Sequence, residues 1–166
     1  MATPAPIDSG KYFAVVLLAV NQYQELMALQ DAPMRESRIR ALARFMQGAV
    51  REMDTVGFFN PGCCSLLLPG AELPAALGIA ERLRRTVEER ELSVEPGGTA
   101  ITISLGVACA GDCDDFVLLL QRAENALEQS KRSGGNSAYY HDGERTVPVQ
   151  SALPERAHNA SRVEIP

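Results

Sequence analysis

Apolar residues along the chain fall into two kinds of pattern. A near-continuous apolar run at 13–20 is typical of a strand buried on both faces of a sheet. Between 35 and 53, apolar residues recur at helical spacing with arginines and glutamates between them, which predicts an amphipathic helix with Pro33 near its start. Later patterns predict two strands around an Asn-Pro-Gly turn, a helix, a strand, a third long helix and a last short strand. These segments are 55–59, 64–68, 72–90, 100–109, 116–132 and 139–140.

The order of the elements predicts the fold class. Strand, helix or helices, hairpin, helix, strand, helix, strand is an α+β order, for which we expect a central, mostly antiparallel sheet flanked by helices. The domain is expected to span 12–142. We expect 1–11 to be a flexible N-terminal lead, and 143–166, which has three prolines and no sustained period, to be a flexible C-terminal tail or linker.

Composition and charge exclude several classes of protein. The chain has 166 residues, 46% of them hydrophobic and 22% charged, which suits one domain with a sizeable core. A net charge of −5 argues against a nucleic-acid surface, and the clustered arginines between 35 and 51 are interleaved with glutamates, as on a solvated helix face. No apolar run approaches the ~20 residues that span a bilayer, so we expect a cytoplasmic protein without membrane insertion.

The stretch from Arg51 to Pro69, REMDTVGFFNPGCCSLLLP, resembles a segment of the diguanylate cyclase (GGDEF) family. There an RxxD motif is followed, five residues later, by the GG(D/E)EF signature. Arg51 and Asp54 match RxxD without a gap. The signature positions hold Asn60, Pro61, Gly62, Cys63 and Cys64.

Other blocks extend the resemblance over about 12–140 and imply the family's cyclase-like fold. The block FAVVLLAVNQY matches the family's first strand and turn, and AERLRR matches AERIR. ITISLGVA matches TxSIGVA, and LLQRAENALEQSKRSGGN matches the segment that ends in GRN.

The resemblance implies that the acids of the active site are missing. In the family, two carboxylates hold magnesium beside GTP, and their positions fall on Ala19 and Gly62. The glutamate of the signature is replaced by Cys63. We therefore predict a pseudoenzyme with no catalytic residue, no metal and no cofactor.

Contacts to GTP are only partly retained. The two positions that hold the guanine base fall on Met27 and Glu36, of which only Glu36 keeps a carboxylate. Lys131 matches the lysine that contacts substrate phosphates, whereas Gly135 stands where the arginine of GRN would be, and Glu128 replaces a tyrosine. Glu36 and Lys131 are the residual nucleotide contacts that the resemblance leaves.

RxxD belongs, in the family, to a separate inhibitory site that binds the product, cyclic di-GMP, usually as an intercalated pair. A guanidinium can pair with guanine O6 and N7 or with phosphate, and a carboxylate accepts from the guanine N1–H and amino group. Arg51 and Asp54 are placed at the end of a predicted helix, and Arg82 falls where the family has a second arginine of this site. The alternative is a surface ion pair between Arg51 and Asp54, with Arg82 paired to Glu81 or solvated.

Three functions remain open. The first is a noncatalytic cyclic di-GMP receptor whose ligand, held by Arg51, Asp54 and Arg82, bridges two domains as a homodimer or docks a protein partner. The second is a ligand-independent scaffold for protein interactions. The third is GTP binding through Lys131 and Glu36 without turnover.

Four cysteines allow two further hypotheses. Cys63, Cys64, Cys109 and Cys113 could supply thiolates to zinc, but they lack paired CxxC spacing, and adjacent cysteines are awkward ligands for one tetrahedral ion. Cys64 takes the family's phenylalanine position and is expected to pack in the core. Cys63 is expected to be exposed, where a redox role is the alternative.

Overall fold

The computed structural model of the chain describes residues 12–110 and 115–153. The strands are β1 (Phe13–Val20), β2 (Thr55–Asn60), β3 (Cys63–Pro69), β4 (Ile103–Cys109), β5 (Ala138–His141) and β6 (Thr146–Pro148). The helices are α1 (Tyr23–Met27), α2 (Ala32–Ala49), α3 (Leu73–Glu89), α4 (Phe116–Arg132) and α5 (Val149–Ala152). No helix within the described residues is both long and apolar enough to cross a membrane.

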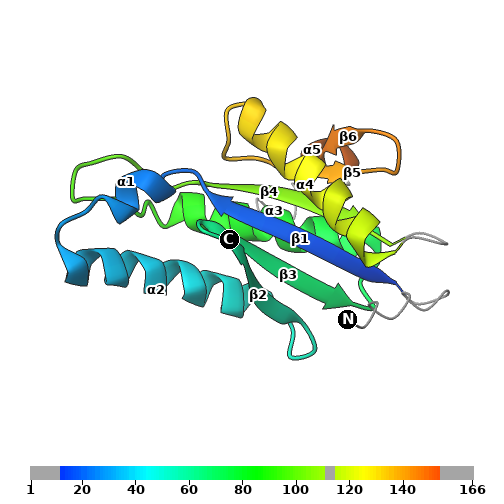
Figure 1. Cartoon of the computed structure of the whole chain (residues 1–166), viewed down its shortest axis with the longest axis horizontal. Coiled ribbons are helices and arrows are strands. Elements are labelled where there is room, and N and C mark those ends of the chain that lie inside the picture. Colours follow the sequence, from blue (N-terminus) through cyan, green and yellow to red (C-terminus); the bar gives the residue numbers. More distant parts are fainter. Residues whose placement is uncertain (1–11, 111–114, 154–166) are drawn as a thin grey trace, which may run out of the picture.

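The strands form one sheet in the order β2-β3-β1-β4-β5-β6 (Figure 1). Every neighbouring pair is antiparallel except β4 and β5, which are parallel. The predicted α+β class with a mostly antiparallel sheet is confirmed. The first and last residues of α4 agree with the prediction, as do those of β1, whose buried apolar run lies in the middle of the sheet.

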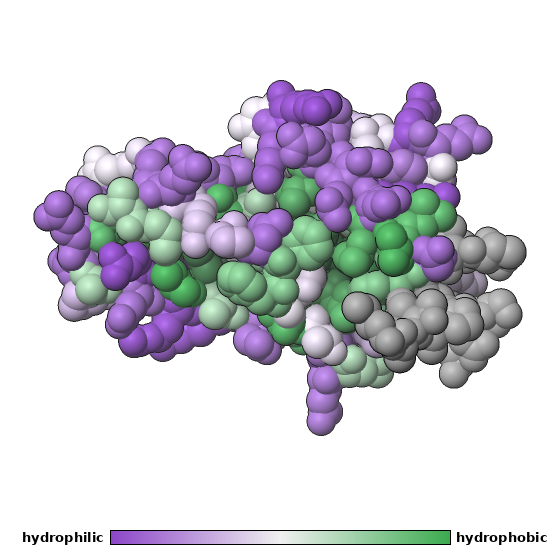
Figure 2. Space-filling model, in the orientation of Figure 1, coloured by the Kyte–Doolittle hydropathy of each residue, from purple (hydrophilic) through white to green (hydrophobic). Residues whose placement is uncertain are grey.

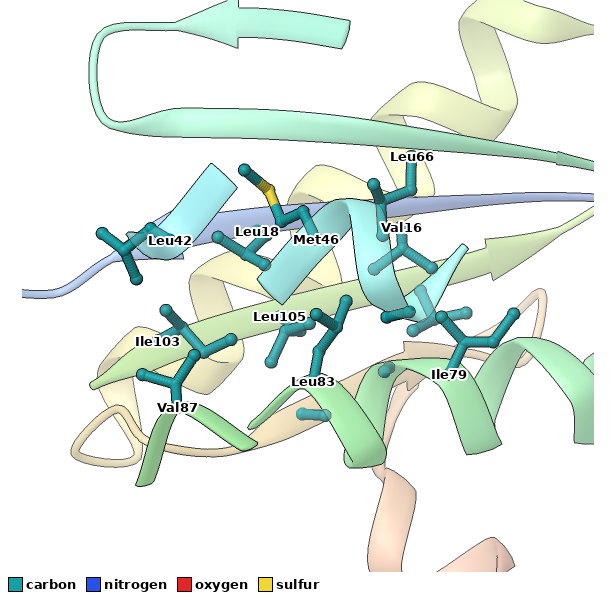
Figure 3. Close-up of a cluster of buried hydrophobic side chains, with 14 of the residues drawn as sticks. Val16, Leu18, Leu42, Met46, Leu66, Ile79, Leu83, Val87, Ile103 and Leu105 are labelled. Carbon is teal, nitrogen blue, oxygen red and sulfur yellow. The ribbon is translucent and has the colours of Figure 1, made fainter. Parts of the chain in front are cut away.

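Helices cover both faces of the sheet. Figure 3 shows one face, where Val16 and Leu18 of β1 point toward Leu83 of α3 and Met46 of α2. On the other face, the alternate β1 side chains pack against α4. Because β1 is buried on both sides, burial of its apolar side chains stabilises both layers of the domain.

Helix α2 ends four residues earlier than its apolar pattern predicts. Val50 is already extended, and the carboxylate of Asp54 accepts a hydrogen bond from the backbone N–H of Arg51 at 2.7 Å. A side chain that captures a backbone donor offers an alternative to the next helical hydrogen bond. Arg51 and Asp54 therefore lie in the turn after α2, not within the helix.

The predicted boundary at residue 142 is wrong. Beyond it, β6 pairs antiparallel with β5, and Val149 of α5 is fully buried in the core. A three-residue strand and a four-residue helix are too short to produce a periodic pattern, so the sequence showed no element there. The predicted lead at 1–11 and the rest of the predicted tail, 154–166, lie outside the described residues.

Candidate functional site

The hairpin between β2 and β3 carries residues 60–64, which the family resemblance aligns with the GGDEF signature. Pro61 and Gly62 form its two-residue turn, with Gly62 at φ +80°, and this pair suits the central positions of a type II turn. The carbonyl oxygen of Gly62 accepts a hydrogen bond from the backbone N–H of Val20 at 3.0 Å. A Cβ at Gly62 would lie 2.7 Å from Cγ of Tyr23, so the turn is packed closely against the start of α1.

Strand register brings together Ala19 and Gly62, the two positions at which the family resemblance predicts metal-binding carboxylates. Ala19 lies opposite Cys63 in β3 and opposite Ser104 in β4, and Gly62 directly precedes Cys63. These residues offer a methyl group, a hydrogen atom and a thiol, none of which is the oxygen ligand that magnesium prefers. Among residues 12–110 and 115–153, no group of three or more His, Cys, Asp or Glu could hold a metal ion.

A polar cavity of about 450 Å³, here called the hairpin cavity, opens beside this point. It is lined by the end of β1, the hairpin turn and the C-terminal end of α4, including Lys131 and Gly135. Gly135 has φ +75°, and a Cβ there would lie 2.8 Å from Nδ2 of Asn21. The side chain of Asn21 is itself held by hydrogen bonds to Thr102 and Ser104.

The two candidate nucleotide contacts do not share a cavity. Lys131 lines the hairpin cavity, whereas Glu36 is exposed on α2 and faces Arg40, with 3.7 Å between Oε2 and Nη2. Met27 lines a different, apolar cavity between α2 and the sheet. Glu128 is also exposed and lies near Arg132 on α4. The arrangement offers one cation for a phosphate but no carboxylate beside it.

Cys63 and Cys64 occupy opposite faces of the sheet. The prediction that Cys63 is exposed is wrong, because its side chain is buried with Ala19 and Leu127 on the α4 side. Cys64 is half-buried against the core on the α2 and α3 side. Adjacent residues of a strand point in opposite directions, so these two thiols cannot bind one ion together. Cys113 lies outside the described residues.

Thiol reactivity gives a direct check on Cys63. Burial raises its pKa to about 11, so at pH 8 only roughly one thiol in a thousand is ionised. We expect labelling of native Cys63 by iodoacetamide to be at least about a hundredfold slower than labelling of the unfolded chain. Mass spectrometry of peptides after timed labelling measures this, and fast native labelling would instead support a redox role.

Arg51 and Asp54 form a two-point ion pair in the turn after α2. Nε of Arg51 lies 3.1 Å from Oδ2 of Asp54, and Nη2 lies 2.8 Å from Oδ1. Nη2 also donates to the carbonyl oxygen of Pro69 at 2.9 Å. The Arg51 side chain is 42% exposed and that of Asp54 is 0% exposed. The hydrogen bond to Asp54 raises the pKa of Arg51, which stays charged at any physiological pH.

Arg82 joins the same end of α2. Its Nη2 donates to the carbonyl oxygen of Ala49, the last residue of the helix, at 2.8 Å, and its side chain is otherwise exposed. The alternative in which Arg82 pairs with Glu81 is not seen, because Glu81 accepts hydrogen bonds from Arg84 and Arg85. The structure therefore places two guanidinium groups and one covered carboxylate around the C-terminal end of α2.

The chain matches a family model over most of its length. Residues 4–137 match the model described as "Diguanylate cyclase, GGDEF domain". Among curated proteins, it is 28% identical over 99 residues to Diguanylate cyclase A of Treponema denticola, covering 59% of this chain and 27% of that protein. It is also 28% identical over 131 residues to the response regulator PleD of Caulobacter vibrioides, covering 77% and 29%. The chain thus spans less than a third of the length of these relatives.

Solved structures share the fold at low sequence identity. The GGDEF domain of DgcB from Caulobacter crescentus, solved in complex with c-di-GMP, has a TM-score of 0.68 at 20% identity and covers 76% of each chain. The active GGEEF domain of a diguanylate cyclase from Vibrio cholerae has a TM-score of 0.72 at 16% identity and covers 80% of this chain and 85% of that one. The family model matches most of the chain and the fold is shared with solved GGDEF domains, so the chain belongs to the GGDEF family.

Proposed function

We propose that this chain is a catalytically inactive GGDEF domain that binds cyclic di-GMP at the end of α2. The observation that carries the proposal is the pair of exposed guanidinium groups, Arg51 and Arg82, each held by a hydrogen bond to a backbone carbonyl oxygen, that of Pro69 for Arg51 and that of Ala49 for Arg82. Hydrogen bonds that orient an arginine before binding reduce the ordering entropy that a ligand would otherwise cost.

Loss of catalysis follows from the chemistry at the hairpin. Joining two GTP molecules requires activation of a 3′-hydroxyl and neutralisation of charge that develops on phosphate oxygens. Ala19, Gly62 and Cys63 provide neither a metal ligand nor a general base, and Cys63 keeps its proton because burial raises its pKa. Lys131 remains as a single cation in the hairpin cavity.

Hydrogen-bond capacity supports a ligand at Arg51. Of its five N–H donors, Nε and both hydrogens of Nη2 are used on Asp54 and Pro69, which leaves the two on Nη1. Those two donors and the exposed edge of Arg82 suit a phosphate oxygen or the O6 and N7 of guanine. Cyclic di-GMP carries both kinds of acceptor.

Asp54 has a different role in this proposal from the one expected. Its carboxylate is covered by Arg51 and cannot meet a guanine amino group while that pair is closed. In this proposal Asp54 orients Arg51, and it contacts the base directly only if the ligand opens the Arg51–Asp54 ion pair. Relatives support the choice of ligand, since the DgcB domain with the same fold was solved with c-di-GMP bound. A paired ligand would also join two copies of the domain.

Calorimetry with an arginine variant tests the proposal. We expect the purified chain to bind cyclic di-GMP and Arg51→Ala to weaken that binding at least about tenfold, the value of one charge-assisted hydrogen-bonded contact. Arg44→Ala is the matched control, because Arg44 is an exposed arginine on α2 away from the turn. Equal losses in both variants would indicate a general charge effect, and absence of binding to the unmodified chain would leave the scaffold alternative.

A further inference from the structure

A second cavity lies between α2 and the sheet. It has a volume of about 300 Å³ and is here called the α2 cavity. Its walls come from β1, α1, α2, the hairpin, α3 and β4, and none of its lining residues is charged. Figure 3 shows Leu42 and Met46 of α2 on one side of this region, with Ile103 and Val87 on the other.

The α2 cavity opens to solvent between α2 and the hairpin. Two of its lining residues are large, apolar and exposed: Ile39 on α2 is 43% exposed and Phe58 on β2 is 78% exposed. Residues that both line a cavity and face water mark its mouth. Figure 2 shows apolar surface interrupting the polar surface on this face of the molecule.

The lining excludes a nucleotide base as occupant. Guanine would leave its N–H and carbonyl groups without partners among these walls, which is costly in an apolar environment. Met27 stands where the family resemblance places a base contact, and with Met46 it gives the cavity two unbranched, adaptable side chains. Water is an equally poor occupant, because it needs two to four polar partners.

We propose that the α2 cavity binds an unbranched alkyl chain, with any polar head group left at the mouth beside Ile39 and Phe58. The volume equals that of about ten water molecules in the liquid, at about 30 Å³ each, which gives room for on the order of ten methylene groups of similar size. Small-molecule sites of this size are typically apolar clefts between packed elements. The α2 cavity is separate from the turn that holds Arg51, so this proposal does not depend on the proposed cyclic di-GMP binding.

A single tryptophan can report on this cavity because the chain contains none. Phe58→Trp places the reporter at the mouth, and Val117→Trp places a matched reporter on α4, at an exposed residue on the opposite face of the sheet. Both variants are titrated with 1-butanol, 1-hexanol, 1-octanol and 1-decanol. We expect saturable emission changes for Phe58→Trp alone, with a Kd that falls about fourfold per methylene, as expected for roughly 0.8 kcal/mol each, until the cavity is full.

A filled cavity provides the blocking test. Ala43 lines the cavity from α2, so Ala43→Phe should abolish the 1-octanol response, whereas Gln47→Phe, on an exposed residue of the same helix that does not line it, should keep it. Saturating 1-octanol should also raise the Tm of the unmodified chain, a readout that needs no variant. No rise in Tm, unsaturable binding, or equal responses at the two reporters would overturn the proposal.

Discussion

Incubated with GTP and magnesium, the purified chain is expected to form no detectable cyclic di-GMP. We expect a rate at least about ten-thousandfold below that of a GGDEF domain with intact acids, because removing a single preorganised electrostatic group costs about 10²–10³ in rate and, in our proposal, two metal-binding positions lack their acid. Ala19 and Gly62 both line the hairpin cavity and both lack a carboxylate, so neither residue can supply the metal ligand that the other lacks. Chromatographic quantification of the nucleotide product measures this rate.

Controls separate intrinsic activity from contamination. Synthesis that scales with protein and disappears in Lys131→Ala would contradict the prediction, because Lys131 is the one cation that lines the hairpin cavity in the described chain. Introducing Asp at position 62 is not expected to restore the reaction. Gly62 has φ +80°, and a side chain there would collide with the ring of Tyr23, so the turn excludes the acid as well as lacking it.

Replacement of Glu81 by alanine is expected to destabilise the fold by about 3–5 kcal/mol. Glu81 and Arg84 form an ion pair on α3, with side chains only 6% and 8% exposed and a shortest distance of 2.6 Å. Arg84 also reaches Glu88 and Asn136, which links α3 to the turn after α4. The hydrogen bond to Glu81 raises the pKa of Arg84, so removal of the acid leaves a buried charge without its main partner. Urea denaturation measures the free energy of unfolding.

The matched control for this prediction lies on the same helix. Glu89→Ala removes an exposed glutamate of α3 and should change the free energy of unfolding by no more than about 0.5 kcal/mol. The double variant Glu81→Leu with Arg84→Met should recover much of the loss, because two apolar side chains need no charged partner. A loss in Glu81→Ala as small as that in Glu89→Ala would show that the pair contributes little.

Long patterns in the sequence predicted most of the fold. The continuous apolar run of β1 and the amphipathic stripes of α3 and α4 extend over many residues, so these elements are clear in the sequence. The end of α2 and the presence of β6 were not predicted by these patterns. The carboxylate of Asp54 ends α2 early by capturing the N–H of Arg51, and the pairing that continues with β6 depends on contacts distant in sequence.

The sequence proposed the residues of the candidate site but could not give their geometry. Matching the family motif located Arg51, Asp54 and Arg82, and all three gather at the end of α2. The motif does not show that Asp54 is covered by Arg51, since that depends on side-chain conformations in the turn. Cys63 was predicted to be exposed but is buried, because strand register decides which face of the sheet each of two adjacent residues occupies. The α2 cavity depends on the distance between a helix and a sheet, which no sequence pattern reports.

Mapping the bound ligand by NMR tests the central claim most directly. We expect addition of cyclic di-GMP to the ¹⁵N-labelled chain to shift the backbone amides of 49–54, at and just after the end of α2, and of Arg82 on α3, while the amides of Asn60, Gly62 and Cys63 in the hairpin stay unchanged. That pattern would place the ligand on the two guanidinium groups. Shifts confined to the hairpin turn and to the C-terminal end of α4 near Lys131 would contradict the account, because they would place the nucleotide in the hairpin cavity instead.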